Sequence, residues 1–400
     1  MSQITQKDHR EIGRELELFF FDEYSPGSAF WLPNGMIIFR ELEKFIRETI
    51  DNRGYQEIST PIIVKNEVFK KSGHWEFFKD SMFNFKVDKE DYSLKPMNCP
   101  ESTIVYSFKT RSYKDLPLRF SEFGRLHRNE RSGTLNGMFR VRQMVMDDAH
   151  VFCRMDQIQE EITEMLDITL NLYNQLKLPI TFGLATRPTK AMGEKKTWIE
   201  AEDQLSKALK SHKIDFVILK GEGAFYGPKI HIDYKDHLGR VWTMATIQVD
   251  FQIPQGMDLN YIDEKGKNQR PVMIHRAILG SFERFIGIIT ELYQGALPTW
   301  LSPQQAIILP ITDKNIPYAK KVEEALKKEN IRVAIDMRNE TLQAKIRDAA
   351  VAKVPYMAVI GGKEEESQKV ALRTRSQEKQ EIISIDEFKN KITESIANKN

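Results

Sequence analysis

The sequence predicts an α+β chain, in which an antiparallel sheet flanked by helices is followed by a smaller α/β domain. A long β-hairpin from Leu118 to Cys153 is indicated by period-two apolar positions, such as Leu118 with Phe120 and then Val141, Val145 and Val151, around a turn-rich segment at 129–137. Apolar residues recur at helical spacing before and after it. From Ala306 onward, strand-like and helix-like segments alternate.

Composition limits the classes of protein to be considered. The chain has 400 residues and 41% hydrophobic content, enough for two domains with a sizeable core. Its formal net charge is only +2, so nucleic-acid binding would require a local basic patch. Two cysteines argue against a disulfide scaffold and favour a reducing, cytoplasmic location. We find no signal peptide and no apolar run of about eighteen residues, so we expect no membrane partner.

The segment before the hairpin contains a helix, a strand and an aromatic stretch. Apolar residues between Ile38 and Ile50 recur at helical spacing, and Gly54 suits the end of that helix. On spacing alone this is an ordinary surface helix. The strand-like YQEISTPII follows, and Cys99 then falls between a short strand and a helix that begins near Pro100.

The hairpin carries more ionisable residues than a packing surface needs. They are Arg125, Arg128, Glu130, Arg140, Arg142, Asp147, Asp148 and His150. Unpaired buried charges are costly, whereas arginine grips phosphate or carboxylate oxygens bidentately. The hairpin is therefore either a polyanion-binding face or a solvated, salt-bridged one.

The region after the hairpin alternates helices and strands. A helix is expected to about Lys177, followed by an antiparallel pair within 221–251 whose turn is at 238–240. The stretch 271–293 has the period of a helix, with Gly280 inside it and Arg284 one turn later. Glycine costs about 1 kcal/mol there, which a ligand lying across that turn would explain.

The C-terminal part is predicted to be a separate domain with mostly parallel central strands. Composition changes near Leu301–Pro303, so we divide the chain into 1–301 and 302–400. A generic nucleotide or redox module is the alternative, but the signatures G-x-G-x-x-G and C-x-x-C are absent from the sequence.

Several motifs resemble those of class II aminoacyl-tRNA synthetases, in the form found in threonyl-tRNA synthetases. HRNE, SG, RVR and DDAH within 127–150 are similar to the second signature motif of that class. The helix, strand and proline at 38–61 resemble the first, which implies a homodimer, and Gly280 to Arg284 resemble the third. DMRNETLQAKIRDA resembles the anticodon-binding domain of threonyl enzymes. The resemblance begins near residue 8, so no N-terminal editing domain is expected.

The resemblance implies ATP, threonine and tRNA(Thr) as partners and assigns roles to single residues. The catalytic residues are Arg128, which bridges the carboxylate and the α-phosphate, His74, which assists transfer to tRNA, and Lys229. ATP is assigned to Arg128, Glu130 (adenine amino group), Arg140 and Arg284 (outer phosphates, with Mg²⁺) and Gln248. Threonine is assigned to Met97, Asp148, Tyr226 and Gln248, and the anticodon to Asn339, Arg347, Glu364 and Arg373.

The resemblance also changes the expectation for a metal. From spacing alone a metal site is improbable, because the histidines and cysteines are scattered. The resemblance implies one zinc ion per chain, held by Cys99, His150 and His275. Three ligands leave room for the amino and hydroxyl groups of threonine, which valine cannot supply together. Serine lacks only a methyl group, worth about 1 to 3 kcal/mol, so serine errors and a separate editing factor are expected.

Some positions depart from the family's pattern. Met144 and Met146 replace an aromatic residue that stacks on adenine and a glutamine near the substrate carboxylate. Glu101 with Ser102, and the segment 243–245, depart as well. Two alternatives remain: a paralogue that activates another hydroxylated amino acid or loads a carrier other than tRNA, and a non-catalytic relative. The second predicts lost phosphate-binding arginines or metal ligands, and none is lost.

Overall fold

A computed structural model describes residues 6–375 and 379–400. Its internal contacts group the chain into two compact units. One contains the described residues up to Phe20, Phe30–Phe45 and the described part of Ile286–Asn400; the other contains Phe21–Ala29 and Ile46–Phe285. The division at 301/302 is a different partition and stays a prediction.

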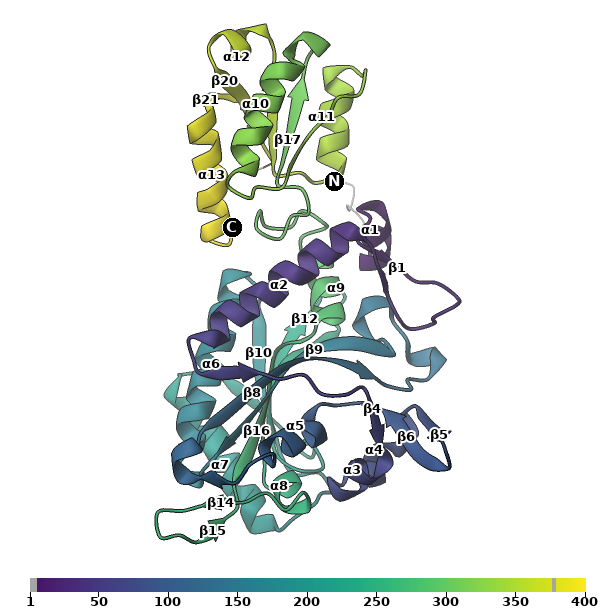
Figure 1. The fold of residues 1–400 in the computed structure, drawn as a ribbon, viewed down its shortest axis with the longest axis vertical. Coiled ribbons are helices and arrows are strands. Elements are labelled where there is room, and N and C mark those ends of the chain that lie inside the picture. The colour runs from purple at the N-terminus through teal and green to yellow at the C-terminus, as the bar shows by residue number, and fades with distance from the viewer. Residues whose placement is uncertain (1–5, 376–378) are drawn as a thin grey trace. The chain divides into compact units, whose positions relative to one another are not determined.

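The second unit is built on an eight-stranded sheet (Figure 1). In spatial order its strands are β11 (Phe216–Leu219), β10 (Ile180–Ala185), β12 (Lys229–Lys235), β13 (Val241–Asp250), β16 (Val272–Ser281), β9 (Gln143–Cys153), β8 (Leu118–His127) and β3 (Tyr55–Glu57). Neighbours are antiparallel except at the two edges, where β11 and β3 run parallel to their partners. The predicted antiparallel sheet and its hairpin are confirmed.

Helices and two small sheets complete this unit. Its helices are α3 (Asn66–Lys71), α4 (His74–Phe78), α5 (Cys99–Tyr106), α6 (Ile158–Gln175), α7 (Lys195–Ser211) and α8 (Gln252–Gly256). The small sheets are β4 (Ile63–Lys65), β6 (Glu90–Leu94) and β5 (Asn84–Val87), and β15 (Asn268–Gln269), β14 (Tyr261–Ile262) and β7 (Arg111–Ser112). Helix α6 contacts β13 and β16 through the apolar stripe expected from its sequence, while α7 contacts β10 and β12.

The helix predicted over 271–293 is wrong in its first half. Val272–Ser281 is the strand β16, and only Phe282–Leu292 is helical, as α9. Each residue from Val272 to Leu279 is at most 9% exposed, because β16 is an inner strand covered on both faces. Such a strand has apolar residues on both faces and no strict alternation, so periodicity does not separate it from a buried helix. Gly280 lies at the end of the strand, with φ +69°, and not inside a helix.

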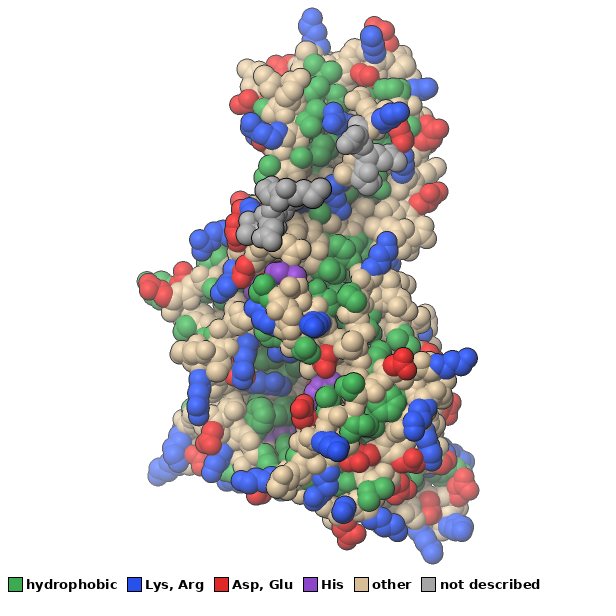
Figure 2. All heavy atoms as spheres, turned by 180° about the vertical axis from the view of Figure 1, so that it is seen from behind, with side chains coloured by type: hydrophobic (Ala, Val, Ile, Leu, Met, Phe, Trp, Pro, Cys, Tyr) green, Lys and Arg blue, Asp and Glu red, His purple; other side chains and the backbone are tan. Residues whose placement is uncertain are grey.

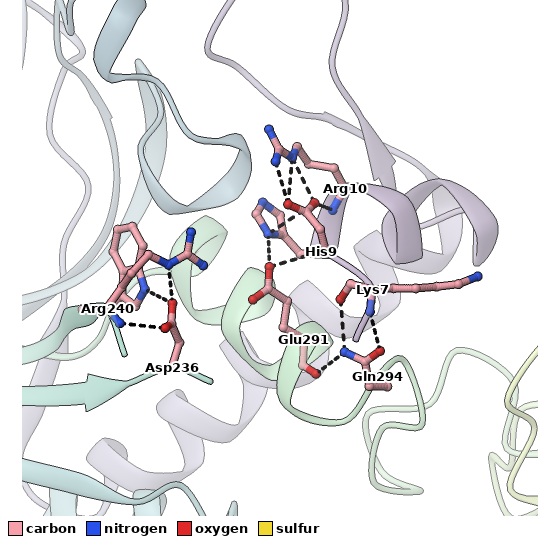
Figure 3. Close-up of polar contacts among 9 residues, drawn as sticks. Lys7, His9, Arg10, Asp236, Arg240, Glu291 and Gln294 are labelled. Carbon is pink, nitrogen blue, oxygen red and sulfur yellow. Dashed lines mark hydrogen bonds and ion pairs between the residues drawn. The ribbon is translucent and has the colours of Figure 1, made fainter. Parts of the chain in front are cut away.

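The turn between β12 and β13, predicted at 238–240, is held by one carboxylate. Asp236 accepts hydrogen bonds from the side chains of Arg240 at 2.6 Å and Trp242 at 2.8 Å, and from the backbone amide of Arg240 at 2.8 Å (Figure 3). The hairpin is thereby fixed, and β13 carries several of the residues considered below.

The C-terminal part of the first unit has the predicted α/β architecture. Its sheet consists of β18 (Val333–Ile335), β17 (Ala306–Pro310), β19 (Tyr356–Ile360), β20 (Lys369–Thr374) and β21 (Glu381–Ser384), in that order. The helices are α10 (Ile316–Lys327), α11 (Leu342–Val351), α12 (Gly362–Glu366) and α13 (Ile385–Ala397). The first three strands are parallel, as expected, and the last two antiparallel. One apolar cluster packs α10 and α13 on the sheet, and another packs α11.

The N-terminal segments of the first unit include α1 (His9–Glu15), β1 (Phe19–Phe20), β2 (Phe30–Trp31) and the start of α2 (Pro33–Asp51). Buried His9 lies with Nδ1 2.6 Å from Oε1 of Glu291, which ties α1 to the end of α9 (Figure 3). Helix α2 confirms the helix predicted at 38–50, and Gly54 has the expected positive φ of 71°. Among the described residues, no helix combines the length and the apolar character needed to cross a membrane.

Candidate functional site

The inner strands of the large sheet form one side of a cavity of about 90 Å³. All three predicted metal ligands and the threonine-site residues line it, together with one arginine of the ATP set. They are Cys99, His150, His275, Met97, Asp148, Tyr226, Gln248 and Arg128. Figure 2 shows a hollow in the face of this unit, in which hydrophobic, histidine and positively charged side chains are visible.

A thiol and two imidazoles meet in this cavity. One potential ligand atom from each of Cys99, His150 and His275 lies within 4.8 Å of the other two, and all three side chains are buried. The ladder between β9 and β16 places His150 directly opposite His275, and Cys99 begins α5. His275 Nε2 lies 2.9 Å from Oδ2 of Asp250, which fixes the ring and leaves its other nitrogen for a ligand. This donor set fits zinc.

Burial keeps Cys99 and His150 in their uncharged forms. It raises the pKa of the Cys99 thiol well above its usual range and lowers that of His150 far below. A neutral imidazole is the form that binds metals, and a nearby cation favours the thiolate. The trio is therefore suited to a cation.

His74 lies beside the trio. Its ring is completely buried, with Nδ1 2.9 Å from Ser72 Oγ and Nε2 3.3 Å from Cys99 Sγ. Burial lowers the pKa of His74 to about 3, so the ring is neutral. The ring also stacks edge-on against Phe225, with centroids 5.4 Å apart. Its role in transfer to tRNA stays a prediction.

Polar groups suited to an amino acid surround the same cavity. The Tyr226 hydroxyl donates to Gln248 Oε1 at 2.7 Å. Asp148 accepts from Asn98 Nδ2 at 3.1 Å, and burial raises the pKa of Asp148 to about 6. The Asn98 side chain passes Gly124 to reach Asp148. A Cβ at position 124 would lie only 2.1 Å from Asn98 Oδ1.

Three arginines predicted to bind phosphates or the carboxylate lie near one another. Arg284, at the start of α9, donates from Nε to Phe139 O at 3.0 Å and from Nη1 to Thr243 O at 2.9 Å. Burial, and secondarily the charges of Arg128 and Arg140, lower the pKa of Arg284 to about 10. Mutually repelling cations held by backbone carbonyls form a site for a polyanion.

Other predicted residues lie at the margin of this site. The Glu130 carboxylate accepts from Nη2 of Arg140 at 2.8 Å, and that arginine is half exposed. Lys229 pairs with Gln248 in the sheet but does not line the cavity, and burial lowers its pKa. Of the two methionines, Met146 lines the cavity and Met144 does not; buried Met144 belongs to a small apolar cluster, against which Met146 also packs.

Several residues of the site were not singled out from the sequence. The cavity is also lined by Leu126, Thr246, Arg276 and Ala277, and Asn98 and Asp250 support its members. Alternation along a strand was the available signal, because Thr246, Gln248 and Asp250 occupy one face of β13. Side-chain partners such as Asn98 had no signal of this kind.

The predicted anticodon residues are on the C-terminal sheet and its helices. Arg347 is on α11, with its side chain 73% exposed and 3.2 Å from Asp348. Glu364 Oε2 accepts from the amide of Gly361 at 2.9 Å and so caps α12. Arg373 is on β20, and Asn339 follows β18.

Comparison with known families agrees with this architecture. Residues 83–293 match the family described as the tRNA synthetase class II core domain (G, H, P, S and T), and residues 305–395 match the anticodon binding domain. Together with the antiparallel sheet and its cavity, these matches define a class II aminoacyl-tRNA synthetase core joined to an anticodon-binding domain.

Individual relatives narrow the family. The chain is 46% identical over 398 residues to the threonine–tRNA ligase of Alkalilimnicola ehrlichii, covering 99% of this chain and 62% of that protein. It is 47% identical to that of Desulforamulus reducens, covering 100% and 63%. A crystal structure described as the RNA binding domain of threonyl-tRNA synthetase from Cryptosporidium parvum has 43% identity and a TM-score of 0.94, covering 97% of this chain and 98% of that chain. The chain belongs to the threonyl-tRNA synthetase family. It spans 62–63% of the length of these two curated relatives.

Proposed function

We propose that the chain activates threonine with ATP and transfers it to tRNA(Thr). The observation that carries this proposal is the buried trio of Cys99, His150 and His275, which shares one cavity with Arg128 and Asp148. The trio supplies donors for a metal, the arginine a partner for the carboxylate and phosphate, and the aspartate an acceptor for a hydroxyl.

The first step joins threonine to AMP. A carboxylate oxygen attacks the α-phosphorus of ATP in line, the bond to the β-phosphate bridging oxygen breaks, and pyrophosphate leaves. Arg128 holds the carboxylate and the α-phosphate together, while Arg140 and Arg284 hold the outer phosphates with Mg²⁺. Glu130 accepts a hydrogen bond from the adenine amino group. For this, the Glu130 carboxylate must either bond to adenine and Arg140 together or release Arg140. Such a reaction depends mainly on positioning and charge stabilisation.

Selection of threonine is assigned to the trio and its neighbours. A zinc ion bound there would supply an open coordination position for the amino and hydroxyl groups of the substrate. Asp148 then accepts the hydroxyl hydrogen bond, and Met97, Tyr226 and Gln248 line the pocket. Valine has the shape of threonine without its hydroxyl, so it offers Asp148 no hydrogen bond in addition to the one from Asn98.

In the second step the terminal ribose hydroxyl of tRNA attacks the acyl carbon, and AMP leaves. His74 and Lys229 are assigned to assist at this centre. Residues 302–400 are assigned to anticodon binding through Asn339, Arg347, Glu364 and Arg373. The helix and strand within 33–61 are assigned to a homodimer interface.

Amino-acid-dependent exchange between ATP and pyrophosphate tests the first step. We expect exchange with threonine, exchange with serine lower by about 10- to 200-fold because one methyl group is lost, and almost none with valine. Reactions without amino acid give the background. Faster exchange with any other hydroxylated amino acid than with threonine would contradict the proposal.

Arg347→Ala tests the second step. The exposed guanidinium of Arg347 lies in the first unit, whereas the cavity lies in the second. We expect the KM for tRNA(Thr) in aminoacylation to rise about tenfold, as for the loss of one charged contact, while threonine-dependent exchange is unchanged. The control is Lys363→Ala, which removes a positive charge from α12. An equal fall in exchange would refute the assigned division of labour.

A further inference from the structure

The corner between β16 and α9 is irregular. Ala277 pairs with Asp148 of β9, but the next pair joins Ser281 to Met146. Three residues of β16, 278–280, therefore lie opposite the single residue Asp147 of β9, which is two more than a regular ladder allows, and they are outside the ladder. Because this part of the unit is buried, the backbone amides released by the break need other acceptors.

A single carboxylate supplies those acceptors. Asp147 Oδ2 accepts from the amides of Ile278 and Leu279, both at 3.0 Å. Its Oδ1 accepts from Nη1 of Arg276 at 2.9 Å. Asp147 is 2% exposed and Arg276 is 1% exposed, so water does not replace either bond readily.

The far side of the corner rests on β13. Gly280 has φ +69°, and a Cβ there would lie 2.3 Å from the carbonyl oxygen of Met244. The preceding residue, Thr243, accepts from Nη1 of Arg284 at 2.9 Å. Ser281 Oγ also accepts from the Arg284 amide at 3.3 Å. Strand β13 therefore contacts both the corner, at Gly280, and the Arg284 guanidinium, whose Nε is held by the carbonyl of Phe139.

We propose that Asp147 is a positioning residue for Arg284 and through it for the outer phosphates of ATP. The inference rests on the proposed function, and it goes beyond that function by assigning a role to a side chain that does not line the cavity. Asp147 holds the two bulge amides, the bulge sets where α9 begins, and the first turn of α9 presents the arginine. The pair of His150 and His275 lies in the regular part of the ladder, so the metal ligands do not depend on this bulge.

Asp147→Asn tests the proposal. The amide keeps one acceptor, but its NH₂ group must face either the bulge amides or the Arg276 guanidinium, which are donors. In threonine-dependent exchange we expect the KM for ATP to rise about tenfold or more, since a small misplacement of a binding group has effects of this size. The zinc content should stay within twofold of the unchanged chain. The KM for threonine should rise less than the KM for ATP, although Arg276, the partner of Asp147, lines the cavity.

Glu161→Gln is the matched control. It removes another buried carboxylate of the same unit, on helix α6, which is bonded to Arg119 Nε at 2.7 Å. Arg119 pairs with Val151 of β9, in the regular part of the ladder and away from the break beside Asp147. We expect it to lower thermal stability without a selective change in the KM for ATP. A purely structural role for Asp147 predicts that both variants behave alike, which would overturn the proposal.

Gly280→Ala is the second variant, to be used if Asp147→Asn does not fold. Its added Cβ would meet the carbonyl of Met244 on β13 and so disturb the same corner. It should reproduce the selective rise in the KM for ATP, and an unchanged KM in a folded variant would also refute the proposal. Absence of threonine-dependent exchange in the unchanged chain would instead refute the proposed function. The two failures are thus distinguishable.

Discussion

Cys99→Ala should purify without zinc and without threonine-dependent exchange. Cys99 supplies the sulfur of the trio. Its loss leaves two neutral imidazoles, so a zinc ion would have no anionic protein ligand. We expect the bound zinc to fall from about one per chain to below one tenth, and exchange to fall to the level measured without amino acid. Metal analysis of the purified chain and the exchange assay measure the two losses separately.

Cys153→Ala is the control for this prediction. Cys153 is the only other cysteine of the sequence, it is also buried, and it pairs with Val272 at the end of β9. Its replacement should cost some stability through a small cavity while zinc and exchange remain. Retained, threonine-specific exchange in a zinc-free Cys99→Ala chain would show that the trio does not select the substrate.

The hairpin could be predicted from sequence because its two arms alternate. Apolar residues recur with period two in both arms, as at Leu118 with Phe120 and at Val141 with Val145, and glycine and asparagine mark the connection. Strand β16 could not be predicted in this way. It is buried on both faces, so apolar residues fill most positions on either side of His275 and Arg276, and the helix that follows extends the same run.

The site could not be predicted from local sequence patterns either, because its residues are far apart in the sequence. The metal trio was inferred from resemblance, since its members are 51 and 125 residues apart in the numbering, from Cys99 to His150 and from His150 to His275. Sheet register brings the two histidines together, and no local pattern reports register. Asn98 and Asp250, which orient Asp148 and His275, are defined only by side-chain hydrogen bonds across the fold.

Arg128→Ala should reduce threonine-dependent exchange by about 10²- to 10³-fold, the usual effect of removing one donor to the developing charge in a transition state. Arg128 lines the cavity that holds the trio, and its guanidinium lies 5.7 Å from the Phe78 ring centroid. The zinc content should not change, because Arg128 contributes no ligand atom to the trio. Steady-state exchange at varied ATP and threonine, with metal analysis, measures both quantities.

Arg128→Lys separates charge from geometry. Lysine keeps the positive charge but replaces a planar fork by a single ammonium group, which cannot bond to a carboxylate and a phosphate in the same plane. If Arg128 bridges the two reacting groups, lysine should recover little of the lost rate and both KM values should remain raised. Full recovery by lysine would mean that Arg128 acts only as a nearby charge. Unchanged exchange in Arg128→Ala would remove this residue from the reaction, and the in-line geometry would then need another donor from the cavity wall.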